Sequence, residues 1–155
     1  MNLPIVSANP LLVEVTRGEM VESRHRGAVA VVQSDGQTAV TIGNIRRMIY
    51  PRSAIKPLQA VFLVESGAAD AFGLTDTELA LACASHNGEP VHVDAVRNWL
   101  DQLGLDEQAL ECGTHGPRRN ADNAVLNKNG LLPGPAHNNC SGKHCGFLSS
   151  AKHLG

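Results

Sequence analysis

The sequence predicts an α+β protein whose strands come first and whose helices follow. Up to Gly43, short runs rich in valine and threonine alternate with glycine turns, whereas after Tyr50 the apolar spacing is helical throughout. This segregation argues against repeated βαβ units. With 155 residues, 43% of them hydrophobic, we expect a single domain, or the N-terminal part of one, with β hairpins in 1–50 and a mainly helical 51–155.

Two hairpins are expected in the first part. Strands over 12–16 and 20–23 flank a turn at Arg17 and Gly18. Strands over 27–33 and 38–42 flank the turn Ser34-Asp35-Gly36-Gln37, which makes this second hairpin the strongest local prediction.

Helices are expected from Pro57 onward. The first runs from about Pro57 to Ser66 and Gly67, and Thr75 with Glu78 forms a capping box that opens the second. A third runs from Pro90 towards Leu103 and ends at Gly104, with Trp99 and Leu103 in the core. Shorter helices are expected over 106–111 and 121–127, a loop over 132–135, and a helix over 142–154 with Phe147, Leu148, Ala151 and Leu154 on its apolar side.

Composition narrows the class of partner. The net charge is −2 and the Lys and Arg residues are scattered, so nucleic acid and anionic membranes are poor partners and a small polar substrate fits better. Residues 1–6 lack the pattern of a secretory signal, and no apolar run approaches the ~18 residues of a membrane span. We therefore expect a soluble, cytoplasmic protein. The cysteines are then thiols or metal ligands rather than disulfides: Cys83, expected in the core, Cys112, Cys140 and Cys145.

Ser53 and Lys56 form an SxxK motif at the start of the first helix. Residues three apart lie on one helical face, roughly 5–6 Å apart, and a lysine held away from water loses affinity for its proton and can activate a serine. Pro57 places the motif in a turn that leads into the helix, where free N–H groups could stabilise an oxyanion. This pattern predicts acyl transfer. In the alternative, Ser53 merely caps the helix.

A second SxxK motif, Ser149 to Lys152, provides a control within the same chain. It lies inside the ordinary amphipathic helix expected over 142–154, so we assign it no chemistry.

Two further clusters carry reactive side chains. Ser85 follows the second helix in Ala84-Ser85-His86-Asn87-Gly88; it could relay protons, act as a nucleophile, or simply satisfy backbone groups in the turn. Residues 137–145 hold two cysteines, two histidines and a lysine at a helix start. Zinc binding is one interpretation, although the spacing matches no common structural zinc site. The others are a reactive Cys140 thiol, activated by the helix dipole and His144, and a Ser141-capped helix with Cys145 buried.

Four segments taken together, 52–59, 64–70, 83–86 and 139–144, closely resemble the serine-lysine, zinc-binding bacterial L-asparaginase family, often called asparaginase II. Residues 13–18 and 25–29 also resemble its opening strands. The resemblance implies a fold similar to serine β-lactamases and penicillin-binding proteins, and hydrolysis of L-asparagine to L-aspartate and ammonia.

The resemblance also implies roles for individual residues. Ser53 would be the family's first serine, with Lys56 as its partner, and Ser85 the second serine. Cys140 and Lys143 would be zinc ligands. Arg52 and His144 are candidates for holding the substrate, Arg52 because a guanidinium fork suits an amino-acid carboxylate.

Members of that family are much longer, so we expect this chain to be an N-terminal half. A further cysteine ligand to zinc and the lysine that serves the second serine would then lie elsewhere, and the chain could act as one part of an oligomer. Two other functions remain open. One is a catalytically silent zinc-binding or interaction fragment; the other is a penicillin-reactive acyl enzyme, which ranks last because no SDN or KTG motif occurs.

Overall fold

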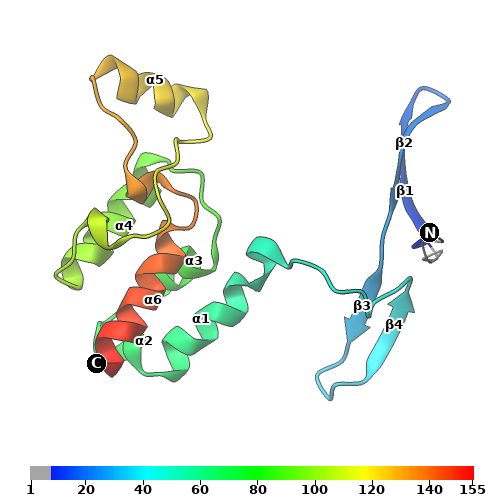
Figure 1. The fold of residues 1–155 in the computed structure, drawn as a ribbon, viewed down its shortest axis with the longest axis horizontal. Coiled ribbons are helices and arrows are strands. Elements are labelled where there is room, and N and C mark those ends of the chain that lie inside the picture. Colours follow the sequence, from blue (N-terminus) through cyan, green and yellow to red (C-terminus); the bar gives the residue numbers. More distant parts are fainter. Residues whose placement is uncertain (1–7) are drawn as a thin grey trace, which may run out of the picture. The chain divides into compact units, whose positions relative to one another are not determined.

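A computed structural model describes residues 8–155 of the chain. The first seven residues lie outside this range. They include residues 1–6, on which the prediction of no secretory signal rests. The chain divides into two compact units, Met1–Tyr50 and Pro51–Gly155. The division falls where the sequence changes from strand to helix patterns (Figure 1).

The described part of the first unit consists of two antiparallel hairpins, as predicted. β1 (Leu11–Arg17) pairs with β2 (Met20–Arg26), and β3 (Val29–Val32) pairs with β4 (Thr38–Ile42), as two separate two-stranded sheets. Gly18 closes the first turn with φ +60°, which glycine adopts without strain. Val13 and Val31 on these hairpins are exposed, since a two-stranded sheet builds no core of its own.

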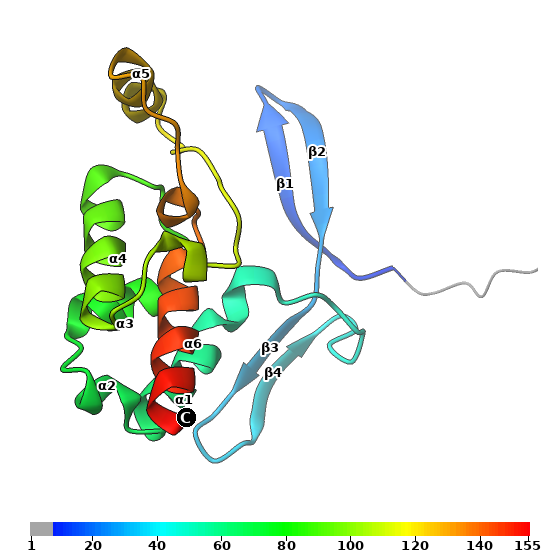
Figure 2. The ribbon, with the colours of Figure 1, turned by 60° about the vertical axis from the view of Figure 1, so that its left-hand side comes forward.

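The second unit is a bundle of helices around α6 (Ser141–Leu154), which packs against four other helices (Figures 1 and 2). These are α1 (Lys56–Glu65), α2 (Ala68–Ala71), α3 (Asp76–Cys83) and α4 (Pro90–Gln102). α5 (Asn120–Lys128) and the short 3₁₀ turns η1 (Arg52–Ile55), η2 (Glu107–Ala109) and η3 (Pro135–His137) complete the unit. The prediction of an α+β protein with segregated strands and helices is confirmed.

Several local predictions in this unit are also confirmed. Thr75 and Glu78 form the expected capping box at the start of α3, with Glu78 accepting from the Thr75 backbone N–H at 2.8 Å. Trp99 and Leu103 are fully buried, and Gly104 ends this segment with φ +63°. The helix expected over 106–111 is only the turn η2.

The predicted buried face of α6 is wrong. Leu154 and Phe147 are exposed, and Leu148 is only partly buried. The buried positions are small residues instead: Ser141, Gly142, Cys145, Gly146, Ser149 and Ser150. The reason is the close approach of α6 to α3, since a Cβ on Gly142 would lie 2.6 Å from the Leu81 carbonyl oxygen. Small side chains are buried there because large ones do not fit.

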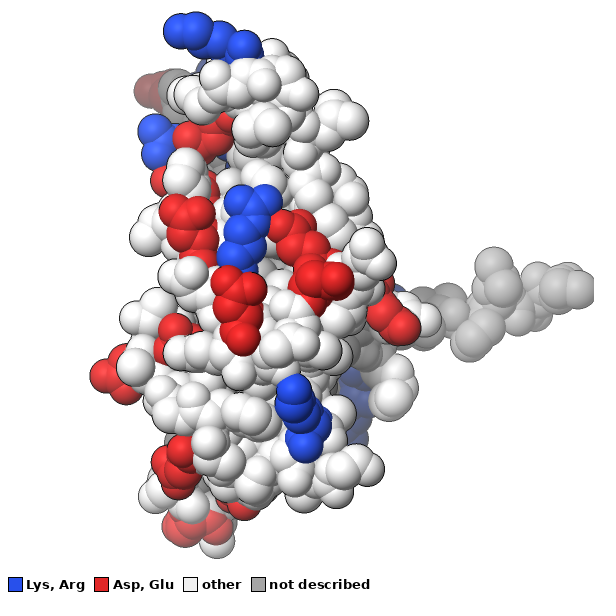
Figure 3. Space-filling view, turned by 90° about the vertical axis from the view of Figure 1, so that its left-hand side faces the viewer, with Lys and Arg blue, Asp and Glu red and all other residues white. Residues whose placement is uncertain are grey.

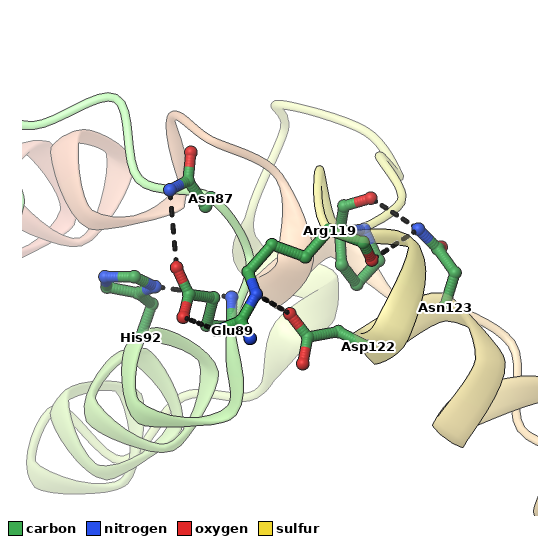
Figure 4. Close-up of polar contacts among 7 residues, drawn as sticks. Asn87, Glu89, His92, Arg119, Asp122 and Asn123 are labelled. Carbon is green, nitrogen blue, oxygen red and sulfur yellow. Dashed lines mark hydrogen bonds and ion pairs between the residues drawn. The ribbon is translucent and has the colours of Figure 1, made fainter.

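α5 buries none of its residues, and polar contacts of Arg119 lie at its start (Figure 4). The Arg119 guanidinium lies 2.7 Å from Glu89 at the start of α4 and 3.7 Å from Asp122. Exposed ion pairs stabilise little, so α5 is the least firmly anchored helix of this unit.

Charged side chains of both signs are interspersed on the face of the molecule drawn in Figure 3. No basic stripe is visible on that face, in line with the scattered Lys and Arg residues of the sequence. Among the described residues, none of the helices combines the length and the apolar character that crossing a membrane requires.

Candidate active site

The turn η1 presents Ser53 immediately before α1. Arg52 has a positive φ of 53°, rare for a side chain other than glycine, and this conformation begins the turn. Pro57 lies in the first turn of α1, where its missing N–H costs no hydrogen bond. The N-cap of α1 is Ile55 and no side chain caps it. The alternative in which Ser53 serves as the helix cap is therefore wrong.

An open pocket of about 250 Å³ brings most of the predicted site residues together. Its lining residues are Arg52, Ser53, Ile55, Lys56, Gln59, Cys140 and Lys143. The first five come from η1 and α1, and the last two from the start of α6. Packing of α1 against α6 thus joins segments that lie more than 80 residues apart.

Lys56 is the best-defined group of the site. It is only 2% exposed, and its Nζ lies 2.6 Å from the Ala84 carbonyl oxygen and 3.3 Å from that of Asn139. The third partner of Nζ is the Ser85 hydroxyl, at 3.0 Å. Nζ donates to both carbonyls and to the Ser85 hydroxyl, so three oxygen acceptors surround the amine. This arrangement suits proton transfer between Ser85 and Lys56.

Ser85 is thus connected to the pocket through Lys56. The contact of Ser85 with Lys56 spans 29 positions of the sequence and so is not local to the turn, and the chemical roles of Ser85 stay predictions. The Lys56 backbone N–H donates to the Ser53 carbonyl oxygen, but among the described residues no side-chain hydrogen bond joins Ser53 to Lys56. The direct pairing of these two residues stays a prediction.

The proposed zinc ligands lie at the start of α6. Cys140 immediately precedes the helix, and Lys143 follows on its first turn, so both can face the pocket. Lys143 Nζ lies 5.4 Å from the centroid of the Phe147 ring, which it faces as a cation–π contact. Among residues 8–155, no group of three or more His, Cys, Asp or Glu side chains is arranged to hold a metal ion. Cys140 and Lys143 provide only two of the four donors that a tetrahedral zinc ion needs.

Comparison with protein families identifies the family of the chain. The family described as L-asparaginase II matches residues 13–155. The chain belongs to the L-asparaginase II family. At the level of this family, the chemistry is hydrolysis of asparagine and the substrate is a small molecule. Among curated proteins, a search finds no match to the chain.

His144 of this asparaginase-family chain is half-buried on α6, with its ring centroid 6.2 Å from that of Phe147. Burial, and then the positive charge of Lys143, hold its pKa below the usual histidine value, so the ring is neutral at pH 7. His144 does not line the pocket that contains Ser53 and Lys56. Its role in substrate binding stays a prediction.

The other interpretations of the cluster over 137–145 have different outcomes. Cys145 is fully buried, as expected, and burial raises the pKa of its thiol to about 12, which makes it unreactive. The prediction that Ser141 caps the helix is wrong, because Cys140 occupies the N-cap position. The Ser141 hydroxyl instead lies 2.8 Å from Nε2 of His86.

Two residues near the asparaginase-family motifs were missed from the sequence. Gln59 lies one turn after Lys56 on α1 and lines the same pocket, and among the described residues its buried Oε1 has no hydrogen-bond partner. The i, i+3 spacing from Lys56 could have indicated it. His86 is 5% exposed, and burial, followed by the charges of His92 and Lys56, lowers its pKa to about 4. No local pattern indicates its contact with Ser141, 55 residues away.

In the second SxxK motif, Ser149 and Lys152 make structural contacts, and the absence of chemistry there stays a prediction. Ser149 is fully buried, accepts a hydrogen bond from Trp99 Nε1 at 3.0 Å, and donates one to the Cys145 carbonyl at 2.9 Å. Lys152 donates to the carbonyl oxygen of Leu103, just after α4. These contacts tie α6 to α4 and form no open site.

Proposed function

We propose that this chain hydrolyses L-asparagine to L-aspartate and ammonia through a serine-lysine site. The observation that carries the proposal is the buried Lys56 amine, hydrogen-bonded to Ser85 at 3.0 Å, in a pocket that also exposes Ser53. Family membership supports the choice of substrate.

In the proposed reaction, Ser53 Oγ attacks the side-chain amide carbon of asparagine, and its proton moves to Lys56. The C–N bond then breaks, and the leaving nitrogen takes a proton relayed from Lys56 through Ser85, so that ammonia departs. Water attacks the resulting aspartyl ester, aspartate leaves, and Ser53 regains its proton. The Lys56–Ser85 hydrogen bond supports the second step of this path.

Substrate recognition in this proposal depends on Arg52 and His144. Arg52 lines the pocket next to Ser53, and its guanidinium would pair with the α-carboxylate of asparagine through two parallel hydrogen bonds. The neutral His144 ring would donate or accept a hydrogen bond without adding charge.

We also propose zinc as a cofactor, with Cys140 and Lys143 as two of its ligands. Both line the pocket, but two donors do not complete a zinc site, so further ligands are needed. When bound, zinc would supply Lewis-acid polarisation or help to position the substrate. Lys143 would have to turn from the Phe147 ring and bind as the neutral amine.

The proposal extends to the fold, which we place with the serine β-lactamase and penicillin-binding-protein group. The support is that strands precede helices along the chain and that the SxxK motif opens a helix packed against a second serine. This support is a likeness of arrangement, so the function depends on the site itself.

A catalytically silent interaction fragment is the second candidate function. Large apolar side chains on α1 are exposed, including Leu58 at 72% and Phe62 at 54%, as expected of a surface that contacts a partner. Self-association would be detected by sedimentation of the purified chain.

Ammonia release from L-asparagine, measured with and without added zinc, tests the proposal. The wild-type chain should release ammonia, Ser53→Ala should lose at least about 10³-fold in kcat, and Ser149→Ala should retain the wild-type rate per folded molecule. No release by the wild-type chain under either condition would favour the silent fragment, and full activity in Ser53→Ala would exclude Ser53 as the nucleophile.

A further inference from the structure

The amine of Lys56 is held by two segments that are far apart in the sequence. The Ala84 carbonyl follows α3, and the Asn139 carbonyl precedes α6. The position of Lys56 Nζ therefore depends on how these two segments are held relative to each other. A hydrogen bond that joins them would control the geometry of the amine.

Such a hydrogen bond lies two residues beyond each carbonyl. His86 Nε2 and Ser141 Oγ are 2.8 Å apart, and the two residues are 5% and 0% exposed. Water cannot compete with this bond at such burial, and the low local dielectric strengthens it. The backbone links 84–86 and 139–141 transmit the position of this bond directly to the two carbonyls.

The proton arrangement of this bond follows from its neighbours. His86 Nδ1 accepts the Gly88 backbone N–H at 3.1 Å, so the proton of the neutral ring is on Nε2. Nε2 then donates to Ser141, and the Ser141 hydroxyl donates to the Ala136 carbonyl at 3.0 Å. Every donor in this series of hydrogen bonds, from Gly88 to the Ala136 carbonyl, has an acceptor. The His86 ring therefore has a single orientation.

We propose that His86 is a positioning residue for the Lys56–Ser85 pair, acting through its hydrogen bond to Ser141. The bond fixes the distance between the two carbonyls that orient the Lys56 amine and thereby sets the position of Nζ against the Ser85 hydroxyl. This inference rests on the proposed function, because it assigns a purpose to the same serine-lysine pair.

The chain contains a matched control for a purely structural effect. Ser149 is as deeply buried on α6 as Ser141, and each accepts from a ring N–H and donates to a backbone carbonyl. Trp99 is the ring partner of Ser149, and neither of these residues adjoins a carbonyl that holds Lys56. Loss of either serine should loosen α6, but only loss of Ser141 should disturb Lys56.

Side-chain NMR of Lys56 in the purified chain tests the proposal without requiring activity. The Lys56 Cε–Hε signal is the one missing from the spectrum of Lys56→Met. It should shift in His86→Asn, which retains an acceptor for Gly88 but cannot reach Ser141, and in Ser141→Ala. It should stay in place in His86→Gln, whose amide N–H can take the position of Nε2, and in Ser149→Ala.

The double variant His86→Asn/Ser141→Ala should shift the signal no further than either single variant, because both changes remove the same bond. Where the wild-type chain releases ammonia, His86→Asn should lower kcat by about 10²-fold with little change in KM, and His86→Gln should restore most of it.

An unchanged Lys56 signal in His86→Asn, or an equal shift in Ser149→Ala, would overturn the proposal. Absence of ammonia release from the wild-type chain would instead count against the proposed function, and the NMR comparison would still decide the role of His86.

Discussion

The two SxxK motifs have the same spacing but opposite burial. In the first, the Lys56 amine is buried and hydrogen-bonded to Ser85, while Ser53 is exposed on a pocket. In the second, Ser149 is buried against Trp99, while Lys152 is exposed. A serine-lysine site needs a hydroxyl that substrate can reach and an amine shielded from water. The SxxK spacing alone does not produce an accessible hydroxyl beside a buried amine. The packing around the motif produces it.

Substitution of the two lysines should produce the largest difference in kcat between the motifs. Lys56→Met should lower kcat for ammonia release by about 10³-fold, because proton transfer to and from the serines is lost. Lys152→Met should leave kcat unchanged within a factor of about two, because its amine donates to the Leu103 carbonyl and does not line the pocket of Ser53. A large loss in Lys152→Met, with the fold intact by circular dichroism, would contradict this comparison.

The hydrogen bonds of Ser141 to His86 and of Ser149 to Trp99 should make different contributions to the pH dependence of stability. The pKa of His86 is about 4 in the folded chain and ~6.5 when unfolded, so between these values the unfolded chain binds more protons. The free energy of unfolding should therefore fall by about 3 kcal/mol as pH drops from 6.5 to 4. Trp99 does not titrate, so its bond to Ser149 should contribute no such dependence.

His86→Gln should remove most of this pH dependence, as measured by urea denaturation at several pH values. Some slope should remain, because burial also lowers the pKa values of His137 and His144. An unchanged slope in His86→Gln would show that His86 is not neutral and buried in the folded chain.

Substitution of Gly142 should test the close contact that brings the start of α6 to Lys56. In Gly142→Ala, the new Cβ would meet the Leu81 carbonyl oxygen at 2.6 Å, and backbone cannot move away cheaply. The free energy of unfolding should fall by about 2–3 kcal/mol.

Gly146→Ala, one turn later, is the matched control for Gly142→Ala. Its three nearest neighbours would be side-chain atoms, the closest belonging to Leu63 at 3.4 Å. The free energy of unfolding should therefore change by no more than about 1 kcal/mol. Equal losses in the two variants, measured by denaturant unfolding, would contradict the assigned close approach of α6 to α3.

The smallest effect should come from Ser149→Ala. The Trp99 N–H would lose its partner in the core, which should cost about 1–2 kcal/mol of stability. Activity per folded molecule should not change. A fall in kcat that exceeds the fall in folded fraction would show that the second motif contributes to the chemistry.

Features set by neighbouring residues were predictable from the sequence. The hairpin around Ser34–Gln37 and the capping box at Thr75 depend only on turn and cap chemistry within a few residues. The SxxK motif was visible for the same reason, because it spans four consecutive residues. The residues gathered in the pocket were found through motif resemblance rather than through periodicity.

Features set by packing were not predictable. The buried face of α6 consists of small residues because α3 approaches closely at Gly142, whereas a hydrophobicity pattern selects the large residues. The Lys56–Ser85 bond spans 29 positions, and the His86–Ser141 bond spans 55. No helical or strand period links residues so far apart, so these contacts emerge only from the assembled fold.

Acid-quench trapping would identify the serine that is acylated during asparagine hydrolysis. The wild-type chain is mixed with L-asparagine, quenched in acid within the first turnover, digested, and searched by mass spectrometry for an aspartyl ester on serine. We expect the ester on the peptide that contains Ser53, and none on the peptide that contains Ser149. An ester on Ser149, or steady ammonia release with no ester on Ser53, would contradict this expectation.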